Sequence, residues 1–225
     1  GNCLTMRPAA MELAAQELCD AFEQGARAMW LVCAGCVKPH VYPLDALAAL
    51  WRDVDADLNA HRTAYLNAYY RAPDGWALQP RQLDDLDTCL KSWPQVTAAF
   101  GRWPDQRAGE QLMVCAARAA ASAWLAGRTR GPVPALRWAA GDTPFADQLA
   151  WLRGVCADAL PGLETLQAGC EYAARPTTRL WKDTVLAQVR LYRLCLQGVV
   201  LLCDAWSAWC DSHYRLCFVR LGRAA

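Results

Sequence analysis

The longest run of helical periodicity in the chain lies near its C-terminal end, at residues 177–221. Apolar residues recur there at steps of mostly three and four, which is the spacing of one face of an α-helix. The middle of the run, residues 194–203, is apolar nearly all round, so other helices should surround it. The stripe comprises Trp181, Val185, Val189, Tyr192, Leu196, Val199, Cys203, Trp206, Cys210, Tyr214, Cys217 and Leu221. The pattern therefore predicts a long C-terminal helix at the centre of the fold.

Charged side chains interrupt this run too often for the sequence to favour a membrane-spanning helix. Arg190, Arg193 and Asp204 bracket its most apolar part, and Gln197 lies inside it. About ten apolar residues remain, whereas a span needs roughly twenty. We therefore expect a core helix here.

Weaker periodicity predicts further helices upstream of this one. Proline and glycine mark many of their ends, as they do at helix starts and stops. Pro94 and Pro161 are expected to break or interrupt helices, because proline lacks the N–H that a helix interior needs. The expected helices cover residues 8–36, 42–70, 81–93, 103–126, 143–160 and 163–173. The fold class predicted is all-α, a bundle of about six helices around a long central C-terminal helix.

The longest stretch without periodicity is residues 127–142, where Gly127, Gly131, Pro132 and Pro134 exclude regular structure. Structureless stretches longer than about 12 to 15 residues are uncommon in compact domains and are often functional. We expect a segment 1–7 followed by one domain, 8–225. The loop would join two possible halves of that domain, 8–126 and 143–225.

This loop carries the candidate partner-binding residues Arg128, Arg130, Arg137 and Trp138. Arginine and tryptophan are favoured at interface hot spots, and tryptophan also suits a membrane interface. The simplest interpretation is a surface connector between helices. The functional alternative is a loop that contacts a protein partner or a lipid headgroup.

Composition narrows the function classes. The 225 residues carry 23 Lys and Arg against 22 Asp and Glu, so the chain has no general electrostatic footprint for nucleic acid or an acidic membrane. Its 12 cysteines and 11 tryptophans are unusual. Cys203, Cys210 and Cys217 recur at helical core spacing, and a free cysteine packs as a small apolar group. We therefore expect mostly reduced thiols in a cytosolic setting rather than disulfides.

The N-terminal residues Gly1-Asn2-Cys3-Leu4-Thr5 suggest lipid attachment. Preceded by a methionine, they resemble an N-myristoylation signal, with Cys3 placed as in N-termini that also receive a palmitoyl chain. One myristoyl chain binds membranes only marginally, so a second signal is needed. Arg7 is the only cation in the first 26 residues, which leaves Cys3 as the natural second anchor. The sequence therefore predicts acylation of Gly1 and Cys3 on the cytoplasmic side of a membrane. A chance match to so short a pattern is the alternative.

Cys33, Cys36 and His40 are the weak candidates for a metal site. The two cysteines are expected at the C-terminal end of helix 8–36, where the helix dipole disfavours a thiolate and so argues against redox chemistry. A zinc site would also need a fourth ligand from elsewhere, and the chain holds no second Cys-x-x-Cys. Core packing is therefore the favoured interpretation.

Catalytic patterns are poor in this sequence. It has 3 histidines and lacks a glycine-rich phosphate loop, a Gly-x-Ser-x-Gly and a His-Glu-x-x-His motif. We therefore expect no enzymatic activity and no cofactor. The leading hypothesis is a membrane-anchored helical adaptor or scaffold with a protein partner. The alternatives are a bundle that encloses an apolar ligand among its tryptophans and cysteines, and a cysteine-based metal or redox protein.

Overall fold

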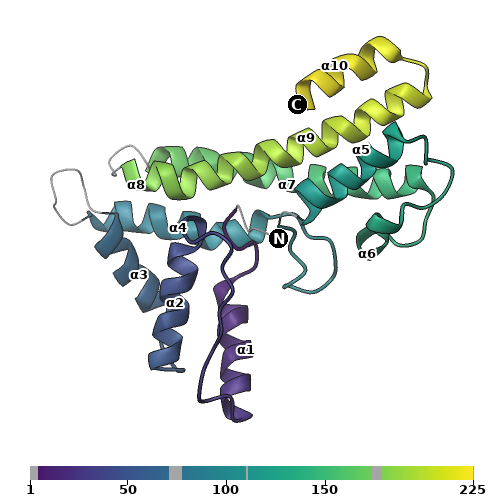
Figure 1. Ribbon diagram of the computed structural model, residues 1–225. Helices are drawn as coiled ribbons and strands as arrows, with labels where there is room; N and C mark the ends of the chain where they lie inside the picture. Colours follow the sequence, from purple (N-terminus) through teal and green to yellow (C-terminus); the bar gives the residue numbers. More distant parts are fainter. Residues whose placement is uncertain (1–4, 71–77, 110, 174–178, 225) are drawn as a thin grey trace.

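The computed structural model describes residues 5–70, 78–109, 111–173 and 179–224, and within these ranges all regular secondary structure is helical. The predicted all-α class is confirmed (Figure 1). In chain order the elements are α1 (Met11–Glu23), η1 (Lys38–His40), α2 (Val41–Arg52), α3 (Leu58–Tyr69), α4 (Pro80–Val96), η2 (Gln111–Ala116), α5 (Ala117–Leu125), η3 (Pro134–Leu136), α6 (Arg137–Ala140), α7 (Phe145–Ala173), α8 (Arg179–Trp181), η4 (Lys182–Leu186), α9 (Ala187–Cys210) and α10 (Tyr214–Ala224).

Three long helices, α4, α7 and α9, form the centre of the molecule, and α7 packs against both of the others. Figure 1 shows α1, α2 and α3 projecting from the side of α4 that faces away from α9, while α10 lies along the outer side of α9. The main core lies between the long helices. Its most buried side chains include Leu86, Leu112, Leu152, Leu163, Trp181, Tyr192 and Leu196. A separate small cluster of Met11, Ala14, Ala46, Leu50 and Leu58 holds α1, α2 and α3 together, and we call these three helices the N-terminal lobe.

The apolar stripe expected on the C-terminal helix is buried as far as Cys203, whereas its later members Cys210, Tyr214 and Leu221 are exposed. Val189, Tyr192, Leu196, Val199 and Cys203 all lie in the main core. The helix begins with the short α8 and the π-helical turn η4, so that Arg179–Cys210 is one continuous helical stretch. The prediction of a long central helix is thus confirmed.

By length and composition, Arg179–Cys210 is the one helical stretch in the described part of the chain that could cross a membrane. The charged residues that argued against a span in the sequence do not exclude it on this criterion. Of its most apolar 18-residue window, 33% is buried within the protein. A core helix of this length passes the same test, and one face of this helix packs on α7.

The expected single helix over residues 177–221 is wrong at its C-terminal end. The chain turns after Cys210, where Ser212 adopts a left-handed backbone with φ of 61°. The N–H of His213 donates to the carbonyl of Ala208 at 2.8 Å and closes this turn. Helix α10 then packs back on α9 and buries Cys217 against α9. By folding back, α10 covers an apolar face of α9 that would otherwise be exposed to water.

The expected helix over residues 8–36 is also wrong in its second half. Helix α1 ends at Glu23, because Gly25 takes a φ of 100° and donates to the carbonyl of Phe22. A glycine in this conformation is a common helix terminator. The residues after it run without helix as far as η1. Cys33, for which core packing was the favoured interpretation, is exposed there, so that interpretation is wrong for Cys33.

The expected helix over residues 42–70 is two helices, α2 and α3. The Asp57 side chain caps α3 by accepting from the N–H groups of Asn59 at 2.8 Å and Ala60 at 3.2 Å. Aspartate is favoured at this position because it satisfies N–H groups that have no partner within the helix. Asp53 and Asp55 therefore lie in a connection between helices and not on a solvated helix face.

The two prolines expected to break helices lie inside continuous ones, Pro94 in α4 and Pro161 in α7. A proline in a helix interior costs about 3 kcal/mol. Both sit beside fully packed core residues, Trp93 and Leu163, whose burial opposes the break. The expected helix 103–126 begins instead at η2, and the preceding residues form a loop that pairs Ala99 with Arg107.

Prediction on helix packing. Gly162 of α7 should not tolerate alanine, because an added Cβ would lie 2.9 Å from the Val96 Cγ1 of α4. Gly154 of the same helix has nothing within 4 Å of that position. We expect Gly162→Ala to lower the free energy of unfolding by about 1 to 3 kcal/mol. Gly154→Ala should raise it by about 0.5 to 1 kcal/mol. Urea denaturation measures both, and equal stabilisation by the two variants would contradict the close approach of α4 and α7.

Candidate functional site

The N-terminal residues of the described chain cross α4 and form one wall of a cavity. The indole N–H of Trp93 donates to the carbonyl of Arg7 at 2.7 Å, and the Thr97 hydroxyl donates to the carbonyl of Pro8 at 2.9 Å. Met6 is buried in the main core beside them. These contacts tie the N-terminal segment to the C-terminal part of α4.

The cavity lies between this segment, the N-terminal lobe, α4 and η4, and has a volume of about 380 Å³. This size is within the range of small-molecule sites. In the described part of the chain its cationic lining residues are Arg7, Lys38, Arg62, Lys91 and Arg107, and Glu12 is the one carboxylate among the lining residues there. Its aromatic lining residues are Tyr42, Tyr65, Tyr70 and Trp93, and no cysteine is among the described lining residues.

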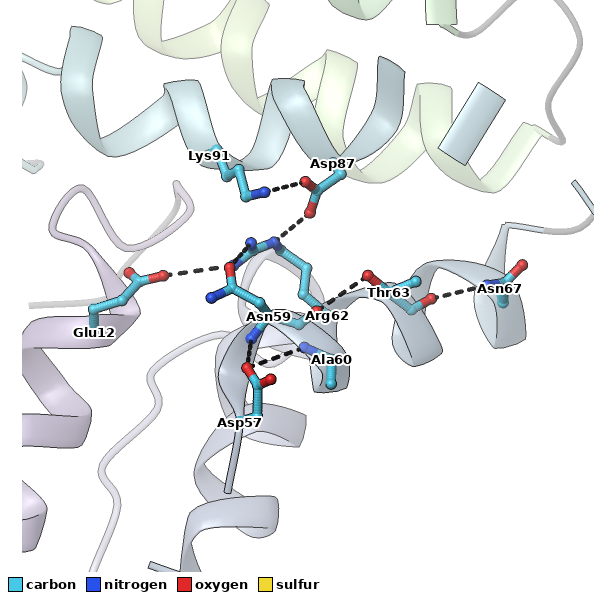
Figure 2. Close-up of polar contacts among 9 residues, drawn as sticks. All are labelled: Glu12, Asp57, Asn59, Ala60, Arg62, Thr63, Asn67, Asp87 and Lys91. Atoms are coloured by element: carbon cyan, nitrogen blue, oxygen red, sulfur yellow. Dashed lines mark hydrogen bonds and ion pairs between the residues drawn. The ribbon is translucent and has the colours of Figure 1, made fainter. Parts of the chain in front are cut away.

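Arg62 of α3 joins the N-terminal lobe to α4 at the edge of this cavity (Figure 2). Its Nε donates to Asp87 at 2.5 Å and one terminal nitrogen donates to Asn59 at 2.7 Å. The other terminal nitrogen lies 3.5 Å from Glu12 of α1. Lys91 binds the second oxygen of Asp87 at 2.5 Å. The Arg62 side chain is only 4% exposed, so this ion pair is shielded from solvent on its arginine side.

Asp87 remains ionised because its cationic neighbours outweigh its burial. Burial by itself would raise the pKa of its carboxyl group, but the hydrogen bonds from Lys91 and Arg62 lower that pKa below its ordinary value. Asp87 therefore carries its negative charge at neutral pH and is shared between two cations.

Tyrosines line the inner wall of the cavity and stay neutral. Burial raises the pKa of Tyr42 and of Tyr65 above the ordinary value. The rings of Tyr65 and Tyr70 meet edge to face at 5.9 Å, and Tyr70 packs in the same way on Trp181 at 5.1 Å. The cluster thus connects the cavity wall to the main core and keeps phenolic donors at the wall.

One polar atom at this wall, the Nε of Arg7, is buried without a hydrogen-bond partner among the described residues. Arg107 also lines the cavity, and it donates to main-chain carbonyls, at 2.8 Å to Thr97 and 3.4 Å to Gln95. Within the described ranges neither Arg7 nor Arg107 forms an ion pair with a carboxylate. A buried polar group without a partner is energetically costly, and a ligand that supplies the missing partner removes that cost.

The acylation candidates Gly1 and Cys3 lie outside the described residues, so their prediction is not tested. The weak metal candidates do lie inside them. The Nδ1 of His40 is hydrogen-bonded to the carbonyl of Cys36 at 2.8 Å, and Cys33 is exposed. No group of three or more His, Cys, Asp or Glu side chains in the described ranges is arranged to hold a metal ion.

Most cysteines of the long helices are buried, whereas Cys195 is half-buried and Cys210, which was expected at core spacing, is exposed. Burial raises the pKa of both Cys156 and Cys203 to about 12. A thiol with so high a pKa carries almost no thiolate at neutral pH and is a poor nucleophile or metal ligand. Cys156 and Cys203 are fully buried in the main core, which is the packing role that their spacing indicated.

The structure disperses the four candidate residues of the 127–142 loop. Arg137 pairs with Asp142 at 2.9 Å, and the ring of Trp138 meets that of Phe100 at 5.7 Å. Arg128 and Arg130 are exposed. The loop is held by the buried Gln148 of α7, whose side chain accepts from the N–H of Val133 and donates to the carbonyl of Gly141. It also contains η3 and α6, so it is partly helical.

Helix α10 presents an exposed surface that is apolar and basic. Phe218 is 78% exposed and Val219 is 46% exposed. Arg215 and Arg223 are exposed on the same helix, and residues 212–224 contain no acidic side chain. Tyr214 is also exposed and meets the ring of Trp209 of α9 at 5.1 Å. The outer position of α10 in Figure 1 leaves this surface open.

Sequence reasoning missed the residues that build the cavity. Arg62 lies four residues after Leu58 and three before Tyr65, so a lone arginine at core spacing was its only signal. No local pattern pointed to Arg7 or Arg107 as cavity residues, because the contact between residues 5–10 and α4 joins distant parts of the chain.

The fold and these features define an all-α protein with a cation-lined cavity and an exposed basic helix. Comparison with known proteins identified no relative of the chain. No family model, curated protein or solved structure matches the chain.

Prediction on the buried ion pair. Asp87→Asn should lower the free energy of unfolding at pH 7 by about 2 kcal/mol, because it leaves the buried Arg62 without a full counter-charge. A carboxyl group with a lowered pKa in the folded state stabilises the fold above its unfolded pKa, and this stabilisation is lost as the pH falls through the folded pKa. The difference between wild type and variant should therefore shrink below about pH 4.

The matched control is Asp183→Asn, because the Arg179–Asp183 pair has side chains that are 92% and 47% exposed. An exposed pair contributes about 0 to 1 kcal/mol. Urea denaturation across the pH range provides the measurement. A cost at Asp87 no larger than that at Asp183, or one independent of pH, would contradict the role of the buried pair.

Proposed function

We propose that the protein is a non-enzymatic helical adaptor that binds a cytoplasmic membrane surface and offers its N-terminal lobe to a protein partner. The observation that carries this proposal is the exposed basic and aromatic surface of α10. Membrane binding is proposed because a helix of this kind can bind a lipid surface through its basic and apolar side chains.

Helix α10 has the composition of an interfacial helix. Phenylalanine and leucine side chains insert at the boundary between headgroups and acyl chains, and arginines bind anionic lipids. Each arginine near an anionic surface contributes about 1 kcal/mol. The cytoplasmic leaflet carries the anionic lipids, which supports the cytoplasmic face as the site of binding.

The opposite side of the molecule supports the adaptor role. An apolar groove of about 350 Å³ lies between α2 and the segment before η1, lined in part by Met29, Trp30 and Trp51. Met29 is 74% exposed and Leu31 is 82% exposed. In Figure 1 the N-terminal lobe and α10 lie on opposite sides of the long helices. A partner that inserts apolar side chains into the groove would therefore not compete with the membrane.

Acylation of Gly1 and Cys3 would add to this mode of binding. A myristoyl chain alone gives marginal affinity, and stable attachment takes two signals. In this proposal α10 is one of the two membrane-binding elements, and the acyl chains are the other.

Prediction on membrane binding. Unacylated protein should co-sediment with phosphatidylcholine vesicles that contain phosphatidylserine and much less with pure phosphatidylcholine. Replacing both exposed arginines in Arg215→Gln/Arg223→Gln should weaken binding about tenfold or more, since each contributes about 1 kcal/mol. Phe218→Ser should weaken binding about tenfold through lost apolar burial. Leu31→Ser is the matched control, because it removes an equally exposed apolar side chain from the other side of the molecule.

The same assay tests the 127–142 loop through Arg128→Gln/Arg130→Gln. If this variant loses binding and the α10 variants keep it, the loop rather than α10 meets the membrane. Hydrogen exchange on vesicles adds a map of the contact. Protection should appear in residues 214–223, while residues 28–37 should exchange as in free protein. Protection of residues 28–37 alone would contradict the proposed orientation.

Prediction on acylation. The gene product expressed from its natural start should incorporate alkynyl analogues of both myristate and palmitate. Cys3→Ser should abolish the palmitate label only and release part of the protein from the membrane fraction. Intact mass measurement identifies the modified residues. An unmodified N-terminal segment in a protein that still binds vesicles would overturn acylation and leave the role of α10 intact.

A further inference from the structure

The cavity beside α4 has an excess of positive charge that the protein does not neutralise. Among the described residues that line it, five are cationic and one, Glu12, is a carboxylate. Asp87 lies next to the cavity, but its carboxylate forms ion pairs with both Arg62 and Lys91. The cluster of Arg62, Lys91 and Asp87 thus keeps one net positive charge. Glu12 lies 3.5 Å from Arg62 and is 58% exposed, so it offsets this charge weakly.

Arg62 has hydrogen-bond donors to spare. A guanidinium carries five N–H groups. Two are used at good distance, by Asp87 at 2.5 Å and Asn59 at 2.7 Å, while the contact to Glu12 is long at 3.5 Å. A buried cation with free donors binds carboxylate or phosphate oxygens strongly, because charge-assisted hydrogen bonds gain strength away from water.

Two further arginines at the cavity wall have no acidic partner within the described ranges. The Nε of Arg7 is buried without a hydrogen-bond partner there. The partners of Arg107 among the described residues are main-chain carbonyls. Buried donors without partners are rare in folded proteins, and a bound ligand is one way to satisfy them. All of these donors fit an acceptor that carries negative charge.

The rest of the wall is apolar or aromatic. Tyr65 and Trp93 expose ring surface to the cavity, and Met6 and Leu90 add aliphatic surface. Such a wall favours a ring or another apolar body, while a few polar groups fix its orientation.

The geometry points to a binding site in this cavity for a small organic anion, an apolar or aromatic body that bears one carboxylate, phosphate or sulfonate group. Arg62, Arg107 and Arg7 supply the cationic donors for the anionic group, and Tyr65 and Trp93 supply the aromatic wall for the body. This site is separate from α10 and does not depend on membrane binding.

Two fluorescent probes with the same aromatic body test this site. 8-Anilino-1-naphthalenesulfonate carries an anionic group, and N-phenyl-1-naphthylamine lacks it. The sulfonate should bind the full chain at one site and at least about tenfold more tightly than the neutral amine, which is the effect of one or two charge-assisted hydrogen bonds. Equal affinity for the two probes would overturn the proposal.

Matched variants locate the site. Arg107→Gln should weaken sulfonate binding about tenfold and leave binding of the amine unchanged. Arg102→Gln is the control, because Arg102 is exposed in the same loop and does not line the cavity. Ala10→Trp should fill the cavity and abolish binding of both probes, with its fold checked by circular dichroism. Phe218→Ser tests the exposed α10 surface and should have no effect. Loss of sulfonate binding in Phe218→Ser, or its persistence in Arg107→Gln, would show that the cavity is not the site.

Discussion

The buried Tyr192 of α9 links the central helices to the loop and the N-terminal segment that shape the cavity. Its hydroxyl donates to the carbonyl of Ala108 at 2.5 Å and accepts from the N–H of Ala98 at 3.1 Å. Its ring meets that of Trp93 at 5.1 Å, and Trp93 in turn holds the carbonyl of Arg7. Because burial keeps the phenol neutral, one side chain satisfies two main-chain groups that have no helix to pair with. The position of the loop and of the N-terminal segment therefore depends on the core packing of a single residue.

The cavity arises where the N-terminal lobe meets the long helices. The N-terminal lobe has its own small apolar cluster, and the long helices form most of the main core. The lobe is attached to α4 through the ion pair between Arg62 and Asp87 and through Tyr65 and Leu66 of α3, which are buried in the main core. Small-molecule sites occur preferentially at such boundaries, because the two surfaces leave space and polar groups unsatisfied between them.

The exposed apolar surfaces lie on opposite sides of the same helical core. The α9–α10 hairpin buries one face of α10 on α9 and leaves Phe218 and Val219 in solvent. The segment before η1 leaves Met29 and Leu31 in solvent at the other side. Contiguous exposed apolar surfaces often mark interaction sites. Their separation by the core permits two contacts at once.

The sequence alone determined the helical class and the central helix, because these depend on the local period of apolar residues, which Val189, Tyr192 and Leu196 follow closely. The prediction from sequence was wrong at several helix ends and at the two prolines inside helices. Gly25 ends a helix through its backbone conformation, and Asp57 begins one by capping it. The burial of Trp93 and Leu163 outweighs the cost of the nearby prolines in the helix interior.

Only the tertiary structure decided the cavity and the fold-back of α10. The cavity brings together Arg7, Arg62 and Arg107, which are widely separated in the chain, and no local pattern encodes their contact. The return of α10 onto α9 depends on one turn at Ser212, where a small conformational cost is met by burying Cys217. Local periodicity specifies which face of a helix is apolar, whereas the surface that covers it is chosen by packing across the whole chain.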